Sequence, residues 1–118
     1  MGTWIEWLPR VGAVVTGLIG LAGFFKPTWI TAGLGIEMTR PVATSEIRGV
    51  LGGLNLGTSV AALVAGNPAV FIALGIGWVG VTAARFYSMA ADGTTLRESI
   101  PPILIDASVA LLFLSAAL

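Results

Sequence analysis

The sequence predicts an all-α integral membrane protein, an antiparallel bundle of four transmembrane helices. Four long apolar stretches occupy most of the 118 residues, of which 56% are hydrophobic and 10% charged. Soluble domains carry about 25% charged residues, and a small soluble fold leaves too much surface exposed to hide such a chain. The later stretches are joined by short connections, which favour antiparallel neighbours. We therefore expect a single integral membrane domain over residues 1–118.

The four stretches are long enough to cross a bilayer. At a rise of about 1.5 Å per residue, segments of roughly 20 residues span a hydrocarbon core of about 30 Å. The transmembrane helices are expected at about residues 8–25, 45–65, 69–90 and 99–118.

The first helix, residues 8–25, is expected to end where Lys26 and Pro27 follow it, because a cation and a proline are typical of a helix exit. No basic segment precedes it, so a retained membrane helix is favoured over a cleaved signal peptide. Trp4 and Trp7 suit the headgroup level of the membrane.

A short interfacial segment is expected between the first two transmembrane helices. Residues 28–36 are moderately apolar but too few to span, and Trp29 lies near their start. We interpret them as a short helix lying at the interface. The second transmembrane helix, residues 45–65, is expected to start at Thr44 or Ser45, which are good N-caps.

The last two helices follow compact turns. The Gly-Asn-Pro sequence at residues 66–68 predicts a tight turn before the helix at residues 69–90. An Asp-Gly pair at residues 92–93 ends that helix. The final helix, residues 99–118, is expected to hold the proline pair at residues 101–102 in its first turn.

The ionisable residues inside the predicted spans form the main candidate site. Arg48, Arg85 and Asp106 lie on three successive helices of alternating direction, so they are expected near one membrane face. Asp106 needs a partner at that depth, and the Arg85 guanidinium suits a carboxylate. Glu46 lies at the same level, and Asn55 needs a hydrogen-bond partner near the midplane. Together they predict one polar cluster that is either structural or ligand-binding.

A cavity wall is expected to continue from this cluster. Trp78 and Thr82 share a helix face with Arg85, and Ser59 shares one with Arg48. A neighbouring stripe of glycines at residues 49, 53 and 57 repeats the GxxxG pattern of tight helix contact.

Composition limits the chemistry. The net charge is zero, with no basic excess to indicate nucleic-acid binding. There is no cysteine and no histidine, so thiolate and imidazole catalysis and their metal sites are excluded. We therefore expect no enzymatic activity, no catalytic residue, no metal and no cofactor.

The run at residues 45–57, Ser-Glu-Ile-Arg-Gly-Val-Leu-Gly-Gly-Leu-Asn-Leu-Gly, resembles the hallmark of a family of small bacterial four-helix membrane proteins of unknown function. Its specific core is Glu-Ile-Arg-Gly-x-x-Gly-Gly. The exit at residues 25–27, Arg85 and Asp106 fit the same pattern. The resemblance implies four helices, the polar cluster and a multi-pass location in the bacterial inner membrane. More remotely, the chain is similar to DoxX-like proteins.

Three functions are weighed. The abundance of small residues and the absence of reactive ones favour an accessory or scaffold subunit, packing against a larger membrane partner or a second copy. The alternative is a binder or carrier of a small hydrophobic ligand, such as a lipid, a sterol-like compound or a quinone, with its polar head at the Arg/Asp cluster. A proton-coupled small transporter that uses Asp106 is the third. Membrane lipids are expected partners in each case.

Overall fold

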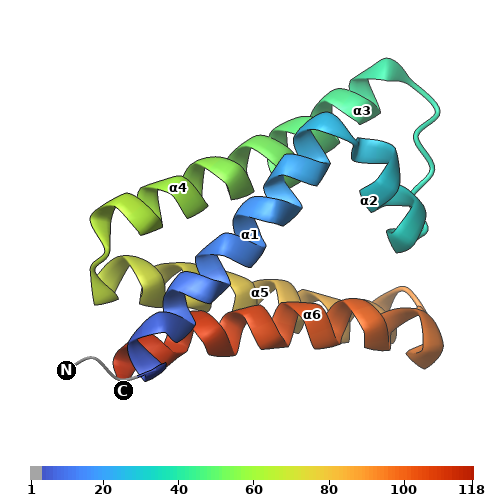
Figure 1. Cartoon of the computed structure of the whole chain (residues 1–118). Coiled ribbons are helices and arrows are strands. Elements are labelled where there is room, and N and C mark those ends of the chain that lie inside the picture. Colours follow the sequence, from blue (N-terminus) through green and yellow to red (C-terminus); the bar gives the residue numbers. More distant parts are fainter. Residues whose placement is uncertain (1–3) are drawn as a thin grey trace. The chain divides into compact units, whose positions relative to one another are not determined.

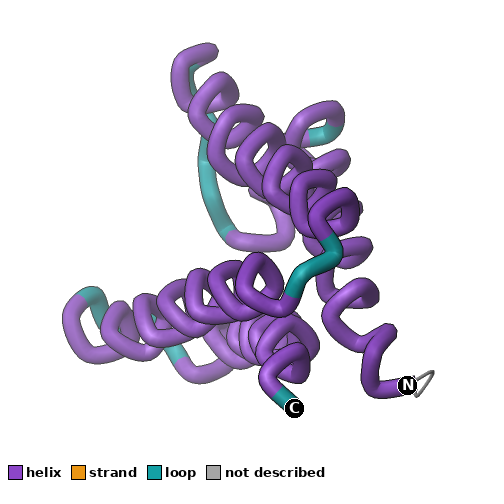
Figure 2. The backbone as a smooth tube through the Cα atoms, turned by 90° about the vertical axis from the view of Figure 1, so that its left-hand side faces the viewer, coloured by secondary structure: helices purple, strands orange, loops and turns teal. Residues whose placement is uncertain are grey.

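The chain is almost entirely helical. The computed structural model describes residues 4–118, and no strand is present among them (Figure 1, Figure 2). The predicted all-α class is therefore confirmed. The chain divides into two compact units, one of residues 13–65 and one that joins the described residues up to Gly12 with Gly66–Leu118.

The elements follow the order expected for a multi-pass chain. In the unit of residues 13–65 the helix α1 is followed by the short α2 and then by one long run of three segments, of which the middle one is π-helical. The other unit holds η1, the first residues of α1, and a pair of long helices followed by η3. The bounds are η1 (Trp4–Trp7), α1 (Leu8–Phe25), α2 (Pro27–Leu34), α3 (Pro41–Ile47), the π-helical η2 (Arg48–Leu54), α4 (Asn55–Ala65), α5 (Pro68–Ala91), α6 (Leu96–Leu114) and η3 (Ser115–Ala117).

Four helical runs within residues 4–118 are long and apolar enough to cross a membrane. They hold 22, 25, 24 and 22 residues, with mean hydropathies between 1.4 and 1.9. At most a third of the apolar window of each run is buried inside the protein. Such apolar surface is what lipid would cover, so length and composition identify a membrane protein. The runs are Trp4–Phe25, Pro41–Ala65, Pro68–Ala91 and Leu96–Ala117.

Two helices begin earlier than the sequence predicted. The second run starts at Pro41, not near Ser45, and neither Thr44 nor Ser45 is its N-cap. Arg40 is extended at that boundary, and proline is well suited to the first helical position because its φ is already helical. Pro41 therefore starts the helix that it was expected to precede.

The last helix begins at Leu96, three residues before the predicted start. Thr95 and Glu98 form a capping box: the Thr95 hydroxyl accepts from the Glu98 N–H at 3.1 Å, and a Glu98 carboxylate oxygen accepts from the Thr95 N–H at 2.9 Å. The proline pair at residues 101–102 consequently lies inside the helix and not in its first turn.

The predicted short helix between the first two spans is present as α2. It ends at Gly35, whose φ of 72° is the left-handed conformation typical of a helix terminus. Trp29 is largely exposed on it, and the Lys26 Nζ lies 5.5 Å from the centroid of the Trp29 ring. The helix is confirmed, and its position at the membrane interface stays a prediction.

Within the unit of residues 13–65, α1 packs antiparallel against η2 and α4 with backbones in contact. A Cβ added at Gly52 would lie 2.5 Å from the Phe24 amide nitrogen, and one at Gly23 would lie 2.8 Å from the Gly52 nitrogen. One turn along, a Cβ at Gly20 would lie 2.5 Å from the nitrogen of Leu56. Only glycine fits at such separations, so these residues permit the approach of the two helices.

In the other unit, α5 and α6 form an antiparallel hairpin (Figure 1). Asn67 caps α5 by accepting from the Ala69 N–H at 2.8 Å. The Phe71 and Phe113 rings stack with centroids 6.3 Å apart, and Phe113 is completely buried. Both antiparallel pairs agree with the predicted alternation of helix direction along the chain. A single four-helix bundle would need the two units to pack together, and it stays a prediction.

Replacing Gly52 with alanine should lower the free energy of unfolding by roughly 1 to 3 kcal/mol, because the new methyl group meets the backbone of α1. Denaturant unfolding in detergent micelles measures this change. The matched control is Gly49→Ala, at the second residue of the same π-helical stretch, where a Cβ meets no atom within 4 Å. Equal stability of the two variants would contradict the packing.

Candidate functional site

Asp106 and Arg85 form the ion pair that the sequence predicted. Asp106 lies inside α6 and is only 4% exposed, and its Oδ2 accepts a hydrogen bond from the Nε of Arg85 on α5. Both residues belong to the same unit. Because a carboxylate this deeply buried needs a compensating charge, the pair ties the two helices of the hairpin together.

Arg48 has a partner that the sequence analysis did not predict. Its Nη1 donates to the backbone carbonyl of Phe24, and Arg48 forms no ion pair with a carboxylate in residues 4–118. Phe24 is the penultimate residue of α1, where carbonyls have no donor within the helix. A cation at this end also interacts favourably with the helix dipole. Arg48 therefore caps α1 from the start of η2.

No hydrogen bond or ion pair of the described residues joins the other predicted members of the cluster to these pairs. The Asn55 side chain donates to the Leu51 carbonyl of its own helix at 3.0 Å. Glu46 is exposed on α3 and forms no ion pair in residues 4–118. Arg48, Glu46 and Asn55 belong to one unit, and the Arg85–Asp106 pair belongs to the other. A single cluster of all five stays a prediction.

The predicted cavity-wall residues use their polar groups locally. The Thr82 hydroxyl donates to the Trp78 carbonyl at 2.9 Å, and the Ser59 hydroxyl donates to the Leu56 carbonyl at 2.9 Å. Such bonds within one helix satisfy a hydroxyl without a tertiary partner. A cavity shared by Ser59 with Trp78 and Thr82 would join the two units and also stays a prediction.

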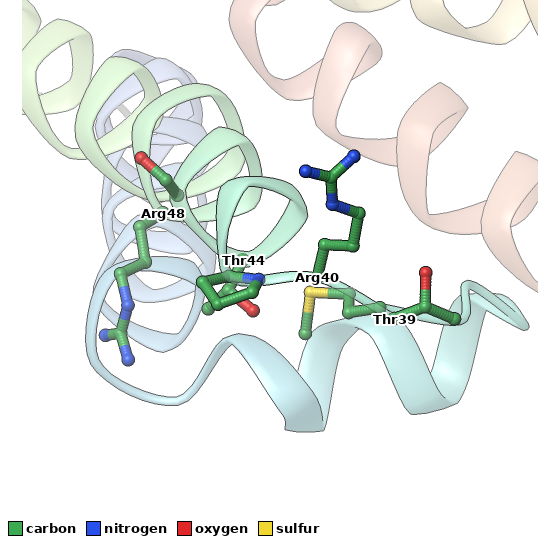
Figure 3. Close-up of a pocket in the computed structure, with 7 residues that line it drawn as sticks. Thr39, Arg40, Thr44 and Arg48 are labelled. Carbon is green, nitrogen blue, oxygen red and sulfur yellow. The ribbon is translucent and has the colours of Figure 1, made fainter.

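The structure contains a surface hollow that the sequence analysis missed. It has a volume of about 510 Å³, opens widely to the outside, and lies where the connection after α2 enters α3 (Figure 3). Of the predicted site residues, only Arg48 lines it. The connection has no regular pattern, so no sequence signal placed its residues beside Arg48. The lining residues are Met38, Thr39, Arg40, Pro41, Thr44, Ser45 and Arg48.

The sequence analysis also missed Thr16 on α1. Its side chain is buried, and its hydroxyl is without a hydrogen-bond partner among the described residues. Every other buried hydroxyl of the described chain, on Thr31, Ser59 and Ser99, has a partner. An unsatisfied buried hydroxyl costs free energy, and a lone threonine in an apolar helix gives no sequence signal for it.

The glycine stripe on η2 and α4 is open. A Cβ at Gly49 or Gly57 meets no atom within 4 Å, and one at Gly53 meets only the Arg48 carbonyl oxygen of its own helix, at 3.8 Å. Gly52, on a neighbouring face of the same stretch, faces the backbone of α1. Within the unit of residues 13–65, one glycine face of this helix is therefore used for packing and the other is left uncovered.

Comparison with known proteins places this arrangement in a family. Residues 5–117 match the family described as Domain of unknown function (DUF4345). The chain belongs to this family. The DUF4345 match covers both units, from η1 to η3, which agrees with the expected family of unknown function. No curated protein and no solved structure matches the chain.

Arg85→Ala should lower the free energy of unfolding by about 3 to 5 kcal/mol, because it leaves the buried Asp106 without its partner. The matched control, Arg40→Ala, should change it by less than about 0.5 kcal/mol, because the Arg40 side chain forms no ion pair in residues 4–118. Thermal unfolding in detergent compares them. Equal midpoints would show that the pair does not stabilise the hairpin.

Arg48→Ala should cost about 1 to 2 kcal/mol, because the Phe24 carbonyl loses its donor at the end of α1. Arg48→Lys keeps the charge near the helix terminus and should recover part of that loss. Hydrogen exchange of the last turn of α1 provides the local measurement. Unchanged protection there in Arg48→Ala would rule out the cap.

Proposed function

We propose that this DUF4345 protein is a non-enzymatic accessory or scaffold subunit of the bacterial inner membrane that packs against a transmembrane helix of another membrane protein. The docking surface is the open glycine stripe, Gly49, Gly53 and Gly57. It lies inside an apolar run long enough to span the membrane. Small residues at this spacing allow a second backbone to approach closely, which is how helices associate in lipid.

The contrast between the two glycine faces of the same helix carries the proposal. Gly52 is filled by the backbone of α1, whereas Gly49 and Gly57 face open space. Glycine lowers helix stability by up to about 1 kcal/mol relative to alanine, so a row of glycines has a cost that only close packing repays. The helices of its own unit supply that packing at Gly52 and do not supply it along the stripe.

The alternatives have less support. Proton-coupled transport would rely on Asp106, but this carboxylate is already engaged by Arg85. Binding of a hydrophobic ligand at the predicted Arg/Asp cluster needs Arg48 and Asp106 in one site, and each has its own partner within its own unit. The absence of cysteine and histidine from the sequence supports a role without catalysis.

The test is a bulky substitution in the stripe. Gly53→Leu in the tagged full-length protein should abolish recovery of its membrane partner after extraction in mild detergent, because the larger side chain separates the two backbones. Native mass spectrometry of the extract measures the partner as a stoichiometric second protein chain.

The matched control is Ala83→Leu, an equally large change on an exposed residue of α5 that lies among bulky apolar side chains such as Val79 and Phe86. It should leave the partner bound. Equal recovery with both variants would contradict docking through the stripe. A bound mass equal to that of a second copy of this chain would show that the partner is a second copy, in a homodimer, and not a larger protein.

A further inference from the structure

The hollow at the start of α3 is lined by two cations with no acidic partner. Arg40 and Arg48 both line it, and neither forms an ion pair with a carboxylate in residues 4–118. The nearest acidic residues along the chain, Glu37 and Glu46, also form no ion pair there. Unneutralised guanidinium groups around one hollow favour an anion, and guanidinium is well matched to phosphate oxygens.

The hydroxyl groups of the hollow are available as donors. Thr39, Thr44 and Ser45 line it, and their hydroxyls make no hydrogen bond within the described chain. Hydroxyls elsewhere on the long helices commonly bond their own backbone, as Thr58, Thr82 and Ser108 do at 2.7, 2.9 and 2.6 Å. The hollow therefore offers several free donors and no carboxylate among its lining residues.

The two arginines differ in freedom. Figure 3 shows the Arg40 and Arg48 side chains extending in different directions from the chain around Thr44. Arg48 is held by its bond to the Phe24 carbonyl, whereas Arg40 makes no hydrogen bond with its side chain in the described residues. Arg40 is therefore the residue that is free to turn toward a ligand, and Arg48 supplies a fixed charge.

The hollow also lies where a lipid headgroup is expected, at the start of a membrane span. Pro41, one of its lining residues, is the first residue of a run that is apolar enough to span. Arg48 binds the Phe24 carbonyl, two residues before Lys26 in the sequence. The Lys26 ammonium group in turn lies over the ring of Trp29, which is exposed. Exposed tryptophan beside cations is typical of the membrane–water boundary.

We propose that this hollow binds the phosphate of an anionic phospholipid headgroup, with Arg40 and Arg48 contributing charge and Thr44 a hydroxyl donor. None of its lining residues belongs to the glycine stripe, and the proposal does not depend on the proposed scaffold function. Phosphate is the group that a lipid shares with a free anion, so the test distinguishes these two sources.

The test uses the full chain in nanodiscs that contain equal amounts of phosphatidylglycerol and phosphatidylcholine. Native mass spectrometry after gentle release measures the lipid retained by each protein molecule. The wild-type chain should retain phosphatidylglycerol in preference, and Arg40→Gln should reduce this retention about fivefold, since one cation near an anionic lipid contributes about a factor of that size. Thr44→Val should cause a smaller reduction.

The matched control is Arg97→Gln, which removes the same charge from an exposed residue of the other unit. Arg40→Gln should keep the wild-type melting temperature, so a loss of lipid is not a loss of fold. Retention that is equal in Arg40→Gln and Arg97→Gln would overturn the proposal. Displacement of the lipid by inorganic phosphate, without preference for phosphatidylglycerol, would overturn the lipid assignment and leave a free-phosphate site.

Discussion

The close approach of α1 to the π-helical stretch at Gly23 and Gly52 is the contact on which the unit of residues 13–65 depends. The last carbonyls of a helix have no donor within that helix, and a neighbouring side chain can supply one. Because the two backbones touch, Arg48 reaches the Phe24 carbonyl at the end of α1. Because these glycines have no side chains, the close packing of the two helices and the capping of α1 by Arg48 occur at the same end of the helix pair.

The two units satisfy their polar groups separately. One uses a guanidinium on a backbone carbonyl, and the other uses the ion pair of Arg85 with the buried Asp106. The polar groups and the helix face that these contacts leave unused indicate where the protein binds other molecules. The free cation and hydroxyls around Pro41 and the uncovered stripe through Gly53 are not needed by the described chain itself. Both proposals rest on this difference between groups that are used internally and groups that are not.

The sequence predicted the spans and the Arg85–Asp106 pair well, because hydropathy identifies spans and helix rise places charges at comparable depths. It did not predict the partner of Arg48, since a backbone carbonyl exists at every position and leaves no pattern. The Thr-x-x-Glu sequence of the capping box could have predicted the early start of α6 at Leu96. The hollow arises from an irregular connection, which no periodicity describes.

Disulfide cross-linking tests the register of α1 and α4 most directly, because the natural chain has no cysteine. A Cβ at Gly17 would lie 3.5 Å from that of Ser59, within the range of a disulfide. The variant Gly17→Cys/Ser59→Cys should therefore cross-link readily in native membranes under mild oxidation. Gly17→Cys/Val60→Cys, with one cysteine on an exposed neighbouring position, should not. Equal cross-linking of the two pairs, or none in the first, would contradict the helix contact that positions Arg48.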